Sequence, residues 1–188
     1  MNIPNILTLL RIFLIPVLVG VFYLGGTWAN ELATFVFWLA ALTDWFDGYL
    51  ARRWNQTSAF GAFLDPVADK LIVAVALVLV VQAHPSAWMT IPAIVIIGRE
   101  ITISALREWM AEIGQRAQVA VSMIGKIKTA AQMLALLMLL YNDSVLGLPI
   151  YKFGFVLLYI AAILTLWSMI IYLRAAIPIL LKNDENNG

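Results

Sequence analysis

Four aspartates are spaced in the sequence so that they fall on two helical faces. Asp44 and Asp47 are three residues apart, and Asp65 and Asp69 are four residues apart. Residues at these spacings lie on the same face of an α-helix. Carboxylate oxygens are ligands for Mg²⁺ and Mn²⁺, and two such ions about 3.5–4 Å apart suit phosphoryl transfer. The pattern predicts a two-metal site where one ion holds a diphosphate and the other orients an attacking hydroxyl.

The elements that must position these aspartates are apolar. The chain has 188 residues, of which 63% are hydrophobic and 12% charged, whereas soluble domains are roughly 45–50% apolar. Runs of about 20 apolar residues match a hydrocarbon core about 30 Å thick. The sequence predicts an all-α integral membrane protein, one domain over 1–188, with six transmembrane helices at 6–24, 31–50, 61–82, 88–109, 124–141 and 153–174. The first run is expected to be retained, because no small-residue cleavage site follows it.

The aspartate pairs fall on the second and third predicted helices, which a short loop joins, so the two acidic faces can lie opposite each other. An ionised side chain at the centre of a bilayer costs about 2.5–3.5 kcal/mol, and neighbouring carboxylates repel one another. Arg52 and Lys70 cannot offset four negative charges. The acids are therefore either protonated or neutralised by cations, and two divalent ions would balance them.

Transfer to a hydroxyl also needs a group that accepts the hydroxyl proton. The chain has no cysteine, and its single histidine, His84, falls in a predicted loop at the opposite side of the membrane from the aspartates. We expect His84 to be a surface-loop residue. A carboxylate must then act as the base, unless a metal-bound water accepts the proton.

Basic residues are distributed unevenly over the predicted loops. If the N-terminus is cytoplasmic, these residues fall at cytoplasmic helix ends: Arg52, Arg53, Arg107, Arg116, Lys126, Lys128, Arg174 and Lys182. Lys152 falls in an outer loop. This asymmetry follows the positive-inside rule. It predicts that the aspartates lie near the cytoplasmic face.

An eight-residue pattern around the aspartates resembles the signature of the CDP-alcohol phosphatidyltransferase family: Asp44-x2-Asp47-Gly48-x2-Ala51-Arg52-x8-Gly61-x3-Asp65-x3-Asp69. The resemblance implies a six-helix membrane enzyme, usually a homodimer, that transfers the phosphatidyl group of CDP-diacylglycerol to an alcohol and releases CMP. It implies that Asp44, Asp47 and Asp65 bind metal. Asp69 would be the general base and, by its spacing, could also contact metal. Asp47 and four further residues would shape the CDP-diacylglycerol pocket: Gly48, Ala51, Arg52 and Gly61.

Three further segments resemble bacterial family members that use sn-glycerol 3-phosphate as acceptor: "NIPNILTLLRI", "GREITISALREWMAEIGQ" and "GKIKTAAQM". The resemblance implies a multi-pass protein of the bacterial inner membrane with its active site facing the cytoplasm. An acceptor phosphate requires fixed positive charge, for which four residues are candidates: Arg99, Arg107, Lys126 and Lys128. The last three could instead be topology anchors. Glu100 could pair with a neighbouring base.

Asn5, Thr8 and Arg11 recur at three-residue steps near the start of the chain. They predict one polar face of an N-terminal interfacial amphipathic segment. Asn5 and Thr8 are expected to help close the CDP-diacylglycerol site from the membrane surface. Interfacial anchoring alone is the alternative role for this segment.

Other functions are also compatible with parts of this sequence. Within the family, the acceptor could instead be inositol phosphate, serine or phosphatidylglycerol. A cation-coupled transporter also carries intramembrane acids, but these acids cluster toward one side and no inverted repeat or pair of broken helices is apparent. A purely structural subunit would leave the acids without a role, and no charged tail indicates nucleic-acid binding.

Overall fold

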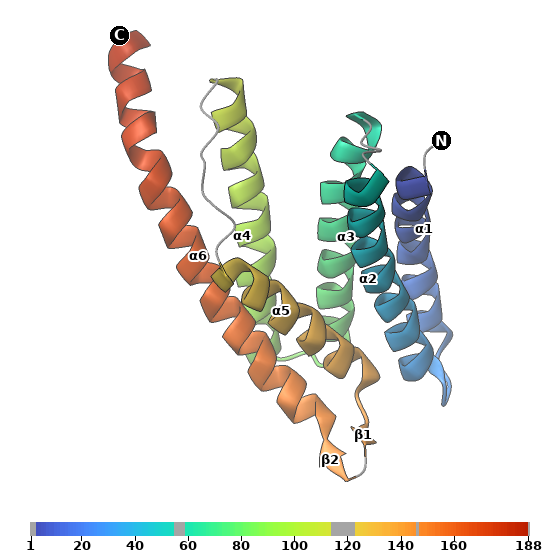
Figure 1. Ribbon diagram of the computed structural model, residues 1–188. Helices are drawn as coiled ribbons and strands as arrows, with labels where there is room; N and C mark the ends of the chain where they lie inside the picture. Colours follow the sequence, from blue (N-terminus) through green and yellow to red (C-terminus); the bar gives the residue numbers. More distant parts are fainter. Residues whose placement is uncertain (1–2, 55–58, 114–122, 146, 188) are drawn as a thin grey trace.

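The computed structural model describes residues 3–54, 59–113, 123–145 and 147–187. Within these ranges the chain forms α-helices and a small antiparallel sheet (Figure 1): α1 (Ile3–Leu24), α2 (Ala29–Trp54), α3 (Ala59–Ala83), α4 (Ala87–Glu112), α5 (Met123–Tyr141), β1 (Ser144–Val145), β2 (Leu148–Pro149) and α6 (Ile150–Asn187). Each helix covers one of the predicted apolar runs. The all-α prediction is therefore confirmed, and α6 continues past the predicted end at residue 174.

Two of the turns that the structure describes, before α2 and before α4, contain residues that favour a change of direction. Gly25 and Gly26 follow α1 with φ of 65° and 102°, a backbone conformation that glycine adopts without steric cost. Ser86 caps the start of α4, and its side chain accepts a hydrogen bond from the Met89 backbone N–H at 3.2 Å. Such caps satisfy amide groups that have no partner within the helix.

Three of the described helical segments are long and apolar enough to cross a membrane: Asn5–Leu24, Ala87–Glu112 and Ile150–Ile177. Ile127–Tyr141 is a shorter apolar helix. Large apolar side chains, among them Phe13, Val78 and Ile163, are exposed on the outside of the helices. Exposed apolar surface on this scale suits lipid rather than water, and fully helical backbone suits the hydrocarbon core. The chain is an all-α membrane protein.

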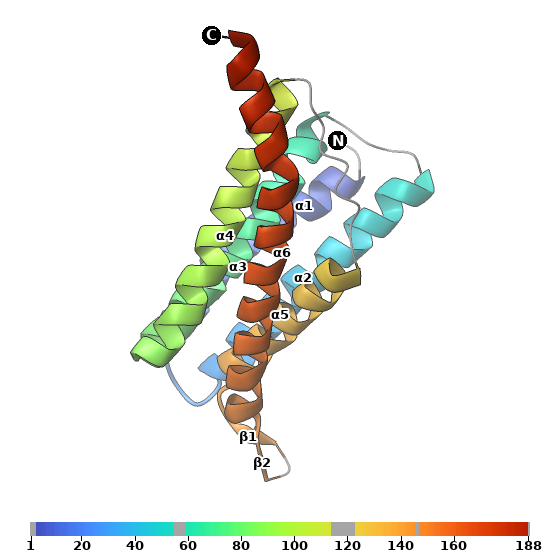
Figure 2. The same ribbon diagram turned by 90° about the vertical axis from the view of Figure 1, so that its left-hand side faces the viewer.

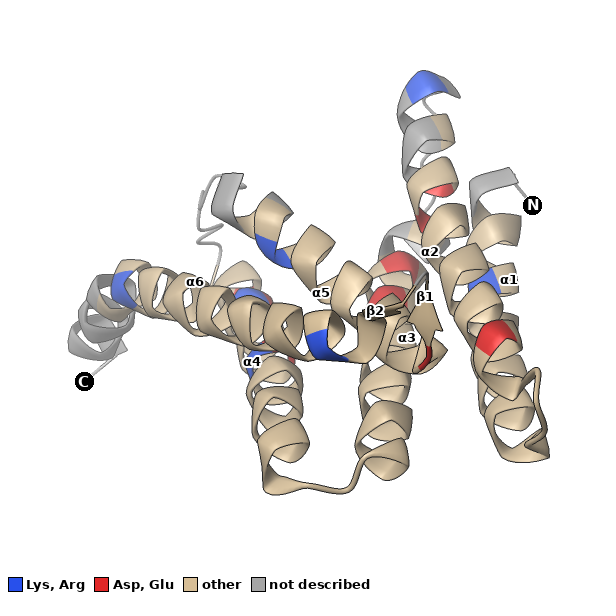
Figure 3. Cartoon of the chain, turned by 90° about the horizontal axis from the view of Figure 1, so that it is seen from below, with Lys and Arg blue, Asp and Glu red and all other residues tan. Residues whose placement is uncertain are grey.

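The helices alternate in direction between two ends of the molecule (Figures 1 and 2). The start of α1 and the ends of α2, α4 and α6 lie at one end, whereas the turns after α1 and α3 and the β1–β2 hairpin lie at the other. Basic residues predicted to be cytoplasmic on α2, α4 and α6 therefore belong to the half of the molecule that holds the start of α1. Seen from below, the acidic residues of α2 and α3 lie to one side and the basic residues of α4, α5 and α6 to the other (Figure 3).

Packing joins the helices in two groups. α1 packs against α2 and α3, while α6 packs against α4 and α5, and α5 also contacts α2. Leu18, Phe37 and Leu136 are fully buried in the shared core. α2 and α3 contact each other less than either contacts α1. The acidic helices therefore do not simply face each other, as the sequence suggested, but share α1 as a common neighbour.

Candidate active site

Arg11 of α1 is the residue on which the aspartates converge. It is 1% exposed. Its Nη1 lies 3.1 Å from Asp44 Oδ1 and also donates to Asp69 Oδ1, while Nη2 donates to Asp47 Oδ2. Asp44 and Asp47 come from α2 and Asp69 comes from α3, so one guanidinium joins three helices. This charge compensates part of the repulsion that three neighbouring carboxylates would otherwise create.

Thr8 extends this arrangement one turn earlier in α1. Its hydroxyl, 1% exposed, donates a hydrogen bond to Asp65 Oδ1 at 2.5 Å. Asn5 is half-buried one turn before that. The predicted polar face of the N-terminal segment therefore exists, but Thr8 and Arg11 turn it into the protein. Anchoring at the membrane surface alone does not account for two buried polar side chains.

The aspartate site suits a hard divalent cation in charge and donor chemistry, because three carboxylates already converge on one buried cationic group. In the described part of the chain, however, no three acidic or histidine side chains lie close enough together to hold an ion as they stand. The Arg11 guanidinium lies among the carboxylates instead. Metal binding by Asp44, Asp47, Asp65 and Asp69 stays a prediction.

The small residues of the signature are only partly described. Gly61 is buried in α3. Three further residues of the signature lie in α2: Gly48, Ala51 and Arg52. Their side chains are outside the part of the chain that the structure describes, so their role in the nucleotide pocket stays a prediction. The same holds for the Lys126 side chain in α5.

A cavity of about 420 Å³ opens beside Asp65 and Asp69, between α3, α4, α5 and α6. The acceptor-site bases predicted from the sequence and described by the structure all line it: Arg99, Arg107 and Lys128. Lys70 lines it as well. Residues that are far apart in the sequence thus form one pocket that joins two aspartates of the signature to a group of bases.

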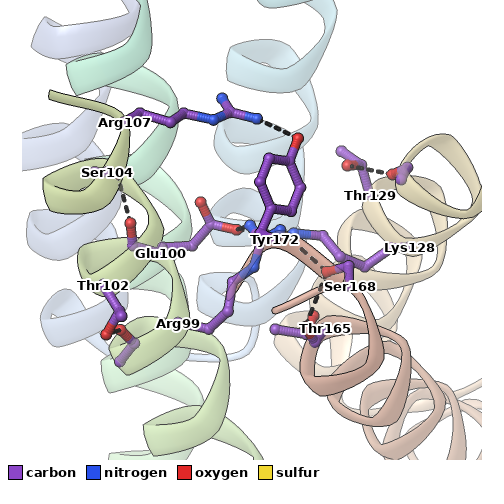
Figure 4. Close-up of polar contacts among 12 residues, drawn as sticks. Arg99, Glu100, Thr102, Ser104, Arg107, Lys128, Thr129, Thr165, Ser168 and Tyr172 are labelled. Atoms are coloured by element: carbon purple, nitrogen blue, oxygen red, sulfur yellow. Dashed lines mark hydrogen bonds and ion pairs between the residues drawn. The ribbon is translucent and has the colours of Figure 1, made fainter. Parts of the chain in front are cut away.

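The bases are arranged around Glu100 (Figure 4). Glu100 Oε1 accepts hydrogen bonds from Arg99 Nη1 at 2.9 Å and from Lys128 Nζ at 2.8 Å. The predicted pairing of Glu100 with a neighbouring base is confirmed, and it involves two bases. We call Arg99, Glu100, Arg107 and Lys128 the basic cluster. Its formal charge is +2, because it holds three basic side chains and one carboxylate.

Helix α6 supplies two residues of this pocket that the sequence analysis missed. Ser168 accepts a hydrogen bond from Arg99 Nη2 at 3.0 Å, and the Tyr172 hydroxyl accepts one from Arg107 Nη2 at 2.6 Å. Both α6 residues line the cavity. Their spacing could have identified them, because polar residues four positions apart in an apolar helix share one face.

His84 lies in the turn between α3 and α4, where its ring is 4.5 Å from that of Tyr151. It does not line the cavity beside the aspartates. The prediction that His84 is a loop residue, remote from the aspartates, is confirmed. The candidate base among the described pocket residues is therefore a carboxylate.

Comparison with known proteins agrees with the signature. Residues 1–167 match the family model described as CDP-alcohol phosphatidyltransferase, so the chain belongs to this family. Relatives from Salmonella choleraesuis (strain SC-B67), Shigella flexneri and Escherichia coli (strain K12) are each 58% identical over 175 residues, which cover 93% of this chain and 94% of the relative. Each of these relatives is named CDP-diacylglycerol--glycerol-3-phosphate 3-phosphatidyltransferase.

Proposed function

We propose that this protein transfers the phosphatidyl group of CDP-diacylglycerol to sn-glycerol 3-phosphate and releases CMP, a step of phospholipid synthesis. The observation that carries this proposal is the cavity that joins Asp65 and Asp69 to the basic cluster. The names of relatives that are 58% identical across nearly the whole chain support the same reaction.

The charge of the basic cluster supports an acceptor that carries a phosphate. The basic cluster has a formal charge of +2, and a phosphate monoester carries about −1.5 to −2 at pH 7. Serine carries no phosphate group to occupy this cluster. Arg99 and Arg107 also offer planar donor groups, which bind phosphate oxygens in pairs.

In the proposed mechanism, two divalent ions, Mg²⁺ or Mn²⁺, would be held by Asp44, Asp47, Asp65 and Asp69 and would stabilise negative charge on the diphosphate. The basic cluster holds the acceptor phosphate. Asp69 accepts the proton of the acceptor hydroxyl while the hydroxyl oxygen attacks the phosphorus attached to diacylglycerol. The bond from that phosphorus to the CMP oxygen breaks, and CMP leaves with the electron pair.

Asp69 is suited to this role because it belongs to both parts of the site. It contacts Arg11 beside Asp44 and Asp47, and it also lines the acceptor cavity. Asn5, Thr8, Asp47, Gly48, Ala51, Arg52 and Gly61 would bind CDP-diacylglycerol. The active site would face the cytoplasm of a bacterial inner membrane, where the lipid substrate enters between helices. The protein would act as a homodimer.

The direct test is an assay of CMP release by the purified protein with CDP-diacylglycerol and one acceptor at a time. We expect release with sn-glycerol 3-phosphate and none with inositol phosphate, serine or phosphatidylglycerol. Asp69→Asn should abolish it. If the wild-type protein released no CMP with any acceptor, the transporter alternative would gain support.

A further inference from the structure

We propose that Tyr172 of α6 binds the acceptor phosphate through its hydroxyl proton and that Ser168 of α6 positions Arg99 for the same ligand. The identity of the ligand as glycerol phosphate rests on the proposed function. The existence of a phosphate site does not, because it follows from the donors that converge on the cavity.

The hydroxyl proton of Tyr172 is available because of the partner of its oxygen. A tyrosine hydroxyl has one proton to donate and lone pairs to accept, whereas a guanidinium can only donate. In the 2.6 Å contact, Arg107 Nη2 must therefore be the donor and the tyrosine oxygen the acceptor. Among the hydrogen bonds of the described residues, none uses the Tyr172 proton. Because Tyr172 lines the cavity, the proton can be donated to an anion bound there.

The contact with Arg107 also strengthens Tyr172 as a donor. A hydroxyl that accepts a hydrogen bond from a cation is polarised, so its own proton becomes a better donor. Hydrogen bonds to an ionised acceptor such as phosphate are stronger than bonds between neutral groups. Tyr172 can therefore add to the phosphate site a donor that carries no charge of its own.

Ser168 has a different part in the same pocket. Its Oγ accepts from Arg99 Nη2 at 3.0 Å and donates to the Thr165 backbone oxygen at 2.9 Å. The serine proton is thus already in use, and the side chain is 6% exposed. Ser168 is a positioning residue that fixes the direction of the Arg99 guanidinium.

The ring of Tyr172 brings the two arginines together (Figure 4). The guanidinium carbons of Arg107 and Arg99 lie 5.1 Å and 5.9 Å from the ring centroid. Cations within about 6 Å of an aromatic centroid are attracted by the ring. One ring thereby holds two groups that repel each other when no anion is present. Both guanidinium groups are therefore held at positions from which they can bind the same phosphate.

The test is a comparison of Tyr172→Phe and Ser168→Ala with wild type, with two readouts. In the transfer assay, we expect Tyr172→Phe to raise KM for glycerol 3-phosphate about tenfold, as befits one lost hydrogen bond to a charged group. We expect kcat and the KM for CDP-diacylglycerol to stay within about twofold. Ser168→Ala should raise the same KM about threefold, since Arg99 keeps its contact with Glu100. Titration calorimetry with inorganic phosphate should show matching losses of affinity.

The matched control is Tyr159→Phe. Tyr159 lies on the same helix and also loses a hydroxyl contact in this variant, to the Trp88 backbone oxygen at 2.7 Å, but it does not line the cavity. Its phosphate affinity and KM should equal those of wild type. An unchanged phosphate affinity in Tyr172→Phe, or equal losses for both substrates, would overturn the inference. A wild-type protein that binds phosphate through Tyr172 but fails to use glycerol phosphate would overturn the proposed function instead.

Discussion

Arg11 places a permanent positive charge among carboxylates that belong to two other helices. Its partner Asp47 is 5% exposed, whereas the side chains of Asp44 and Asp69 are 49% and 46% exposed. Water screens the two exposed pairs, so they add little stability. The buried pair is different, because loss of one partner leaves an uncompensated charge in a medium of low dielectric constant. Among its ion pairs, the one with Asp47 is therefore the pair through which Arg11 affects stability most.

Arg11→Ala is therefore expected to lower the free energy of unfolding by about 3–5 kcal/mol when divalent ions are removed with EDTA. Mg²⁺ should raise the unfolding temperature of this variant more than that of wild type, because the released carboxylates would then have no other cation nearby. Thermal unfolding in detergent micelles, with and without Mg²⁺, measures both effects. Equal responses of the two proteins to Mg²⁺ would argue against a shared site for Arg11 and the ion.

Arg99→Ala should raise KM for glycerol 3-phosphate about tenfold to a hundredfold, because charged hydrogen bonds contribute about 1.5–3 kcal/mol each. The KM for CDP-diacylglycerol should not change. Lys152→Ala is the control, since Lys152 is exposed and does not line the acceptor cavity. An unchanged KM for glycerol phosphate in Arg99→Ala would remove this residue from the acceptor site.

At the scale of helices, the acceptor site depends on how closely α5 and α6 pack. A Cβ added to Gly154 of α6 would lie 2.8 Å from Met138 Cβ and 3.2 Å from the Ala135 backbone oxygen, both on α5. The absence of a side chain at Gly154 therefore allows the two helices to approach. Further along the same pair of helices, Lys128 on α5 and Tyr172 on α6 line one cavity.

Gly154→Ala should force these helices apart and lower the free energy of unfolding by about 1–3 kcal/mol, the usual effect of overpacking. Thermal unfolding in micelles is the measurement. Gly20→Ala is the matched control, because a Cβ at Gly20 meets no atom within 4 Å. If both variants unfolded at the wild-type temperature, the close approach at Gly154 would be of no consequence for stability.

The sequence located the helices and identified the aspartates of the site, but it did not show which side chains contact them. Apolar runs locate membrane helices because the hydrocarbon core sets their length, and the signature identified the family from eight positions. Neither signal says which helices pack together. That depends on side-chain fit, so the contacts of Arg11 with the aspartates and of Tyr172 with Arg107 appeared only in the structure.

At the scale of the whole molecule, the alternation of the helices agrees with the distribution of basic residues. The start of α1 and the ends of α2, α4 and α6 lie at the same end of the molecule (Figure 1). The proposed orientation places this end in the cytoplasm. Glycerol phosphate, a soluble anion, would then enter from the cytoplasm, while the lipid substrate diffuses within the membrane.

Single cysteines can test this orientation, since the chain has none of its own. We expect Asn55→Cys to react with a membrane-impermeant thiol reagent only from the cytoplasmic side. Ser144→Cys, at an exposed position of the β1–β2 hairpin, should react only from outside. Labelling of position 55 from outside would reverse the proposed topology.

The position of Arg11 in the first helix bears on how the protein is made. Synthesis begins at the N-terminus, so α1 enters the membrane before α2 and α3 do. The positive charge would thus already be present when the aspartates arrive, and it would offset part of the cost of placing carboxylates in the membrane, which reaches about 2.5–3.5 kcal/mol each at the bilayer centre. The order of the helices along the chain therefore lets the acidic helices insert next to their counter-charge, before any metal or substrate is bound.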